Sequence, residues 1–111
     1  MTLQNSVANI CLKQGHVLSA NCKRINDSDD PSTWPESSID INEYIGNVNG
    51  AFVWGGEHFV LTADDLHVGL QGDSIILTAN LLILDKKKWN NKVQLNLSER
   101  IVIKDGEFTF Q

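Results

Sequence analysis

The sequence predicts a small all-β domain built from two similar halves. Three observations lead to this prediction. Short runs of β-branched and aromatic residues recur along the chain, Asn-Gly or Asp-Gly pairs separate some of them, and no segment keeps a helical period for three turns. The chain has 111 residues, of which 41% are hydrophobic and 21% charged, which is the balance of a globular protein with one core. We therefore expect one domain, residues 1–111.

Four glycines mark the turns of expected β-hairpins. The pairs Asn49-Gly50 and Asp105-Gly106 supply the positive φ that a two-residue type I′ turn needs, and each precedes an aromatic strand. Gly15 and Gly72 lie between apolar runs in the same way. Each of these turns is expected to join two antiparallel strands.

Two short helical turns are also expected, at residues 42–46 and 98–102. In each, a polar residue precedes Glu43 or Glu99, and an isoleucine follows. These segments are too short for a regular α-helix, so they are predicted as single 3₁₀ or α turns.

The two halves of the chain match after a shift of 56 residues, which takes Ile39 to Leu95 without a gap as far as Trp54 and Phe110. The same shift carries residues 6–12 onto 62–68. The order strand, turn, strand, helical turn and hairpin therefore occurs twice. We expect tandem repeats of approximately residues 1–56 and 57–111.

The net charge of −5 has the wrong sign for binding nucleic-acid phosphates or anionic lipid. No run approaches the roughly 18 apolar residues that span a bilayer. Residues 1–14 lack a basic region followed by an apolar run, so the chain as written carries no secretory signal. These features predict a cytoplasmic protein with neither a nucleic-acid partner nor membrane insertion.

Enzymatic activity is not expected. The neighbouring carboxylates Asp64 and Asp65 lie on a predicted strand, where adjacent side chains point to opposite faces. His16, His58 and His67 lie in separate segments without the spacing of metal ligands. The sequence thus predicts no catalytic residues, no metal and no cofactor.

One group of motifs resembles a known family. The residues LSANCKR, a tryptophan shortly before SSIDINEYIGNVNG, and then FVWGG and HF resemble the cyanovirin-N homology lectins, over almost the whole chain. This resemblance implies two repeats, each with a triple-stranded antiparallel sheet and a β-hairpin, intertwined by strand exchange. It also implies metal-free binding of high-mannose glycan arms that end in α1,2-linked mannose, at two shallow sites near opposite ends of the molecule.

The first site implied by the resemblance, the central site, combines the turn after the first helical turn, the linker between the repeats and a strand of the second repeat. Its third part departs from the family, because Leu82, Ile83 and Leu84 replace polar and basic side chains. The residues carried over are Asn47, Val48, Asn49, Glu57, His58, Thr62, Asp85 and Lys86.

The second implied site, ranked below the first, combines the N-terminal segment, the residues after the first hairpin and the turn near the C-terminus. Ile103 stands where the family's turn carries an Asn, and residues 26–33 form a longer loop that could cover or extend the site. The residues carried over are Asn5, Ser6, Lys23, Arg24, Ile25, Asn26, Lys104 and Asp105.

The cysteines also depart from the pattern of cystine-containing relatives. The positions that face Cys22 and Leu81 hold Val7 and Ala63, so neither family disulfide can form. Cys11 lies four residues beyond Val7, too far along the strand for a bridge to Cys22. Two free thiols are expected. The three tryptophans, Trp34, Trp54 and Trp89, are expected in the core.

The resemblance leaves two functions open. One is a lectin for mannose-containing oligosaccharides or glycoproteins, expected to be monomeric with a strand-exchanged dimer as the other form. The alternative is a lectin fold whose sites are degraded by Leu82–Leu84 and Ile103, acting as a protein-interaction or structural module.

Overall fold

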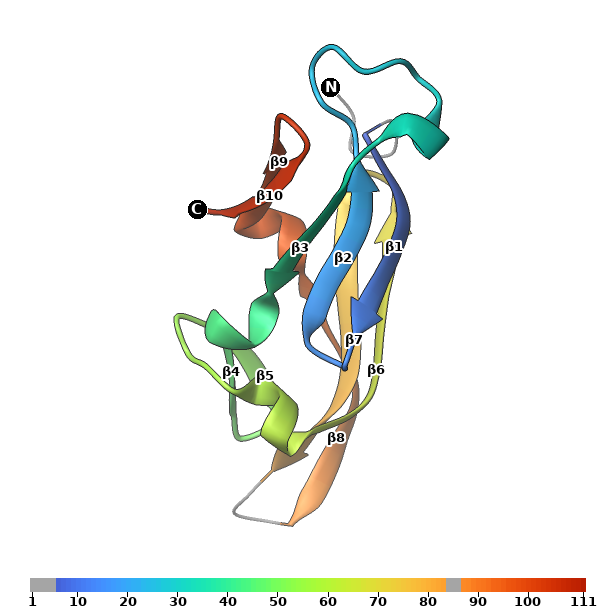
Figure 1. The fold of residues 1–111 in the computed structure, drawn as a ribbon. Coiled ribbons are helices and arrows are strands. Elements are labelled where there is room, and N and C mark those ends of the chain that lie inside the picture. Colours follow the sequence, from blue (N-terminus) through green and yellow to red (C-terminus); the bar gives the residue numbers. More distant parts are fainter. Residues whose placement is uncertain (1–5, 84–86) are drawn as a thin grey trace.

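A computed structural model describes residues 6–83 and 87–111, which form an elongated molecule of 51 × 22 × 20 Å (Figure 1). Within these residues a three-stranded sheet and a hairpin are followed by a second three-stranded sheet and a second hairpin. The first half contains β1 (Val7–Lys13), β2 (Val17–Cys22), β3 (Glu36–Asp40), β4 (Ile45–Val48) and β5 (Ala51–Trp54). The second contains β6 (Ala63–Gln71), β7 (Ser74–Ile83), β8 (Lys88–Asn96), β9 (Ile101–Lys104) and β10 (Glu107–Phe110). The all-β prediction is confirmed.

The two three-stranded sheets are built alike, in the orders β1-β2-β3 and β6-β7-β8. The predicted hairpins at Gly15 and Gly72 join the first two strands of each. Each first strand also carries a bulge, where Asn9 and Asp65 have φ of 57° and 52°. Asp65 is therefore not the ordinary strand neighbour of Asp64 that the sequence predicted, because the bulge interrupts the alternation of faces.

The two hairpins β4–β5 and β9–β10 turn at the expected dipeptides. Asn49 and Gly50 have φ of 49° and 87°, and Asp105 and Gly106 have φ of 47° and 84°. Asn, Asp and Gly adopt this left-handed backbone at low cost, which is why these pairs specify the turn.

Each hairpin packs against the sheet of the other half, as the strand-exchanged architecture requires. The hairpin β4–β5 contacts β7 and β8, and β10 contacts β3. Asn90 Nδ2 donates to the Gly50 carbonyl oxygen at 2.9 Å, and the Phe108 N–H donates to Ser37 Oγ at 3.1 Å. Neither half therefore buries its apolar surface without the other, and the intertwining is confirmed.

The two central helical turns lie slightly earlier than the sequence predicted. They are the 3₁₀ turns η3 (Ile41–Glu43) and η6 (Leu97–Glu99), and the residues expected at their ends, Ile45 and Ile101, instead begin β4 and β9. Asp40 and Asn96 cap them, with side-chain oxygens that accept the Asn42 and Ser98 N–H groups at 3.0 and 2.9 Å. The strand assignment follows from burial, since both isoleucines lie in the core between the two halves.

The core runs along the molecule between the sheets. On β7 the residues Ile75, Leu77, Ala79 and Leu81 are buried, while their neighbours face outward. Trp34 is buried and Trp54 packs against the core, but Trp89 is 47% exposed. The prediction of a core position for Trp89 is wrong, because Trp89 pairs with the partly exposed Leu82 on the outer face of the sheet.

Both cysteines are free, as expected from the strand pairing. Val7 faces Cys22, and Ala63 faces Leu81. Cys11 is exposed and Cys22 is buried. Burial raises the pKa of the Cys22 thiol to about 11, so this thiol stays protonated at neutral pH.

In the part of the chain that the structure describes, there is no helix of the length and apolar character needed to cross a membrane.

Candidate functional site

The first hairpin turn is tied to the second half of the chain through Asn47. Its Nδ2 donates to Thr62 Oγ1 at 2.9 Å and to the Leu82 carbonyl oxygen at 3.0 Å, and its Oδ1 accepts the Gly50 N–H at 2.8 Å. One amide thus joins β4, the turn, η4 (Phe59–Thr62) and β7. Because both amide hydrogens are engaged within the protein, Asn47 acts here by positioning the turn.

The tip of this turn presents Val48 and Asn49, which are both exposed. Gly50 sits against the neighbouring sheet so closely that a Cβ there would lie 2.7 Å from Ile83 Cγ1 and 3.1 Å from Asn90 Cβ. Sequence reasoning did not include Asn90 among the site residues. The turn is therefore held on two sides, with its tip facing solvent.

The linker between the repeats brings Glu57 and His58 to the same region. Both are exposed, and Glu57 Oε2 lies 3.8 Å from His58 Nε2. Asn42 holds the linker: its carbonyl oxygen accepts the His58 N–H at 2.7 Å, its Oδ1 accepts the Val60 N–H at 3.1 Å, and its Nδ2 lies 3.4 Å from His58 Nδ1. Asn42 was not predicted as a site residue, although its place in the Asn-Glu helical turn was visible.

The central site thus gathers six of the eight residues carried over from the resemblance, and the other two, Asp85 and Lys86, lie outside the described residues. Apart from the apolar Val48, the gathered groups are neutral and acidic hydrogen-bonding side chains on a turn and a linker. Such groups match hydroxyl-rich ligands, because hydroxyls both donate and accept.

The second site is assembled around Asp105, at the other end of the molecule (Figure 1). Its Oδ1 accepts the Ile25 N–H at 2.9 Å, which joins the C-terminal turn to the segment after β2. Lys23 N–H donates to the Ser6 carbonyl oxygen at 2.8 Å. A Cβ at Gly106 would lie 2.5 Å from Arg24 Cγ. The structure brings these residues together, with Asn26 and Lys104 exposed nearby in the sequence, whereas Asn5 lies outside the described residues.

The cations of the second site are already paired with acids of the long loop. Arg24 Nη2 lies 3.1 Å from Asp27 Oδ1, and Lys23 Nζ lies 2.6 Å from Asp29 Oδ1. Hydrogen bonding to Arg24 lowers the pKa of Asp27, and hydrogen bonding to Lys23 lowers the pKa of Asp29. Because of these pairs, Lys23 and Arg24 offer less to a ligand than the sequence suggested.

The loop itself is ordered by its own hydrogen bonds. Asp30 caps η2 (Pro31–Thr33) by accepting the Ser32 N–H, and the buried Trp34 donates from Nε1 to the Ser28 carbonyl oxygen at 2.7 Å. The loop therefore covers the basic residues with its acids while its base is anchored by a buried tryptophan.

Ile103 is the clearest difference between the two ends of the molecule. It occupies the position of Asn47 in the second repeat and packs against the core. An isoleucine side chain has no hydrogen-bonding group, so the second turn lacks side-chain hydrogen bonds like those of Asn47, which we call the tether of the first turn. The second turn is held by Asp105 instead.

Among residues 6–83 and 87–111, no cluster of three His, Cys, Asp or Glu side chains is placed to hold a metal ion.

These features define a class: an internally duplicated all-β domain whose halves exchange hairpins and whose polar turns lie at its two ends. The model of the CVNH domain family matches residues 4–109, and the chain belongs to that family.

Known relatives agree with this assignment. The chain is 32% identical over 78 residues to a cyanovirin-N homolog of Neurospora crassa, a match that spans 68% of each chain. It is similar to the solved CVNH structure of Gibberella zeae, with 34% identity, a TM-score of 0.77 and coverage of 97% of this chain and 95% of that one. A designed cyanovirin-N homolog lectin has 30% identity and a TM-score of 0.80, with both chains fully covered.

Two more distant structures share the fold. Microvirin has 21% identity, a TM-score of 0.76 and full coverage of both chains. A variant of MoCVNH3 has 22% identity, a TM-score of 0.78 and coverage of 98% of this chain and 96% of that one.

Proposed function

We propose that this protein is a metal-free lectin for α-linked mannose, such as α1,2-mannobiose or the arms of high-mannose glycans, and that the central site is its main binding site. Membership of the CVNH family supports sugar binding, and the designed relative is itself a lectin. Microvirin was solved with mannobiose, and the MoCVNH3 variant was solved with (N-GlcNAc)4.

The observation that carries the proposal is the turn held by Asn47. The hydrogen bonds from Asn47 to Thr62 and Leu82 fix the turn relative to the linker. Asn49, Glu57 and His58 then offer an amide, a carboxylate and an imidazole from a preorganised surface. Preorganisation lowers the ordering cost of binding, and a wrong sugar epimer leaves polar groups unpaired at roughly 1–3 kcal/mol each.

The second site is proposed as a weaker one, because Lys23 and Arg24 are engaged by loop acids. A glycan with two arms can bind to one end of a single protein molecule, or its two arms can bind to the ends of two different protein molecules. If both sites work, multivalent glycoproteins would be bound more tightly than mannobiose, because linked contacts add avidity.

Isothermal titration calorimetry with α1,2-mannobiose tests the central site, with galactose as the control sugar. The variant Glu57→Ala is expected to weaken binding by roughly threefold to tenfold, because one hydrogen bond is removed. The matched control Glu99→Ala changes an exposed acid of η6 in the second repeat and should bind like the unchanged protein. Equal affinities for mannobiose and galactose, or no heat with either, would overturn the proposal.

The second candidate is a protein-interaction module, and one observation favours it. Val48 is 59% exposed and Leu61 is 80% exposed, and these apolar side chains flank Asn47 and Thr62 along the chain. Exposed apolar residues of this kind suit a protein surface better than a sugar. If Val48→Ser and Leu61→Ser leave mannobiose binding unchanged but abolish association with a protein partner, this second role gains support.

A further inference from the structure

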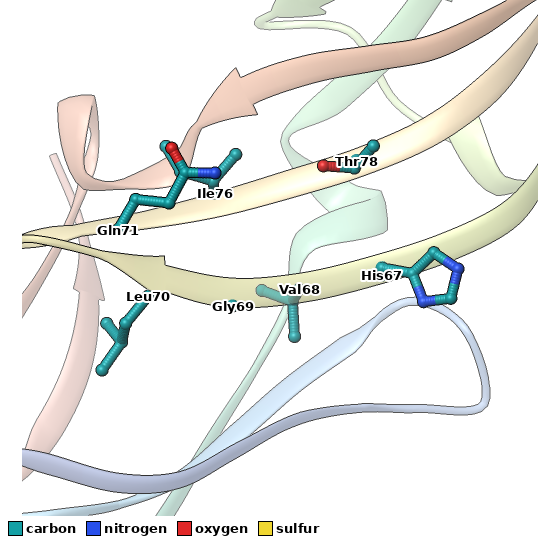
Figure 2. A pocket seen from close by; sticks show the side chains of 7 residues that line it. All are labelled: His67, Val68, Gly69, Leu70, Gln71, Ile76 and Thr78. Carbon is teal, nitrogen blue, oxygen red and sulfur yellow. The ribbon is translucent and has the colours of Figure 1, made fainter.

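The outer face of the second three-stranded sheet contains a hollow. It has a volume of about 220 Å³ and lies over β6 and β7, centred near Gly69 (Figure 2). Its lining includes His67 and Gln71 of β6 with Ile76 and Thr78 of β7. Val68 and Leu70 of the edge strand β6, which pair with the buried Leu77 and Ile75, complete the lining, whereas no core-facing residue of β7 lines the hollow.

The repeat explains why the hollow exists. The strand pairing sets Gly69 opposite Ile76, and His67 opposite Thr78. In the first sheet the same pairing sets Lys13 opposite Val17, and Cys11 opposite Ser19. Gly69 therefore stands at the position of Lys13, and Thr78 at the position of Ser19.

In the first sheet, an ion pair covers the position equivalent to the hollow. Lys13 Nζ lies 2.6 Å from Glu36 Oε1, and Ser19 Oγ donates to the same oxygen at 3.2 Å. As a result Ser19 is only 1% exposed, although it lies on the outer face. The second sheet has Gly69 in place of Lys13 and Lys92 in place of Glu36, so it cannot form this cover, and Thr78 remains partly exposed.

The floor and the rim of the hollow have different chemistry. Gly69 and Ile76 give an apolar floor, and an added Cβ at Gly69 would meet no atom within 4 Å. Thr78 supplies a hydroxyl, and Gln71 supplies an amide. The His67 ring is held by a 2.8 Å hydrogen bond between its Nε2 and Asp65 Oδ1. Hydrogen-bonding groups thus surround an apolar centre.

The volume of the hollow and the charges around it limit the kind of ligand that it can bind. The volume is below the roughly 300–1,000 Å³ of pockets for drug-sized molecules, so it suits a single ring. Asp64 and Asp65 of β6 and Asp73 in the turn between β6 and β7 are exposed, and they disfavour an anion. An uncharged ring with one flat apolar face and hydroxyls at its edge satisfies both the floor and the rim.

We infer that the hollow around Gly69 is a binding site, separate from the two hairpin ends, for an uncharged pyranose whose hydroxyls are all equatorial, as in a β-glucoside. The flat face of such a ring lies on Gly69 and Ile76, and its edge hydroxyls bond to Thr78, Gln71 and His67. A mannoside fits less well, because its axial hydroxyl interrupts the flat face. The site is shallow, so the expected dissociation constant is about millimolar.

The test is an NMR titration of ¹⁵N-labelled protein with methyl β-D-glucopyranoside, up to about 50 mM, well above that dissociation constant. We expect shifts confined to residues 67–71 and 76–78. The variant Gly69→Leu should abolish them without loss of stability, because its side chain enters open space at an ordinary strand backbone. The control Glu107→Leu places the same side chain at an exposed strand position of the second hairpin and should leave the shifts intact.

A second variant keeps the test independent of the folding of Gly69→Leu. Thr78→Val retains the shape of the side chain but removes the hydroxyl, and it should weaken binding by roughly threefold to tenfold. Absence of shifts at these residues, or shifts that survive both substitutions, would overturn the inference. Because the mannobiose experiment reads other residues, failure here leaves the proposed mannose site untouched, and failure there leaves this site standing.

Discussion

The two hairpin ends of this molecule have the same backbone and different means of attachment. Both turns use an Asx-Gly pair with positive φ, and both meet the opposite half of the chain. The first turn is tied by the Asn47 amide to Thr62 and Leu82, whereas the second carries Ile103 at that position and is tied by Asp105 to Ile25. Duplication has thus conserved the fold of the turn while the contacts that hold it have diverged.

This difference separates the interactions that the fold requires from those that are specific to one site. The glycine and the positive φ occur at both ends, so they belong to the architecture. The tether and the charges differ between the ends, so they are the features that make one site unlike the other.

The largest expected effect comes from adding a side chain at Gly50, where the first turn packs closely against β7 and β8. Gly50→Ala places a Cβ 2.7 Å from Ile83 Cγ1 at a φ of 87°, so both a clash and backbone strain result. We expect a loss of about 2–4 kcal/mol in the free energy of unfolding, measured by urea denaturation.

The matched variant Gly106→Ala has the same backbone strain, and its Cβ would lie 2.5 Å from Cγ of Arg24, an exposed side chain that can move aside by giving up its pairing with Asp27. A loss of about 1–2 kcal/mol is expected there. If Gly106→Ala proved more destabilising than Gly50→Ala, the first turn would not be the more tightly packed of the two.

Removal of the Asn47 tether should have the next largest effect. Asn47→Ala leaves the Thr62 and Leu82 acceptors without this donor and frees the turn, for an expected loss of about 1–3 kcal/mol in the free energy of unfolding. Val48→Ala, one residue away and exposed, is the control and should change stability by less than about 0.5 kcal/mol. Equal stability of the two variants would contradict the role given to Asn47.

The tether of the second turn should matter less, because it is exposed. Asp105→Ala removes the acceptor of the Ile25 N–H, and we expect a loss of about 0.5–1.5 kcal/mol by thermal or urea unfolding. Lys104→Ala serves as the control at the neighbouring exposed position. A cost for Asp105→Ala above that for Asn47→Ala would reverse the order of the two ends.

The smallest effect is a dependence on pH at the second end. The pKa values of Asp27 and Asp29 are lowered below the ordinary 3.8 by Arg24 and Lys23. Lowered carboxyl pKa values stabilise the fold fully at pH values above 3.8, and this stabilisation is lost as the pH falls through the folded-state values. Amide shifts of residues 24–30 should therefore change below pH 3.8, as followed by NMR. Titration of either carboxyl above pH 3.8 would contradict this assignment.

Much of the fold could be predicted from local patterns. The Asx-Gly pairs fixed the hairpins because few other residues adopt positive φ cheaply, and the 56-residue shift revealed the duplication. The helical turns were predicted one residue late at their start and three residues late at their end, since whether Ile45 belongs to a turn or a strand depends on burial against the other half. Trp89 was misplaced because an aromatic residue on a strand has the same pattern on either face.

Less of the candidate site could be predicted. The resemblance supplied the residue types at both ends, but it could not show that the Asn47 amide is engaged within the protein. The pairing of Arg24 with Asp27 depends on the conformation of a long loop, and the contact of Asn90 with Gly50 joins residues that are distant in the sequence. Such long-range contacts leave no periodic signal in the chain.

The most direct test of the account is a residue-resolved NMR titration with α1,2-mannobiose, because it measures both ends in one experiment. We expect shifts of Asn49, Glu57, His58 and Thr62 at lower sugar concentration than any shifts of Ser6, Lys23 or Asp105. Saturation of the second end before the first, or no response of either end at millimolar sugar, would contradict the assignment of the central site as the main binding site.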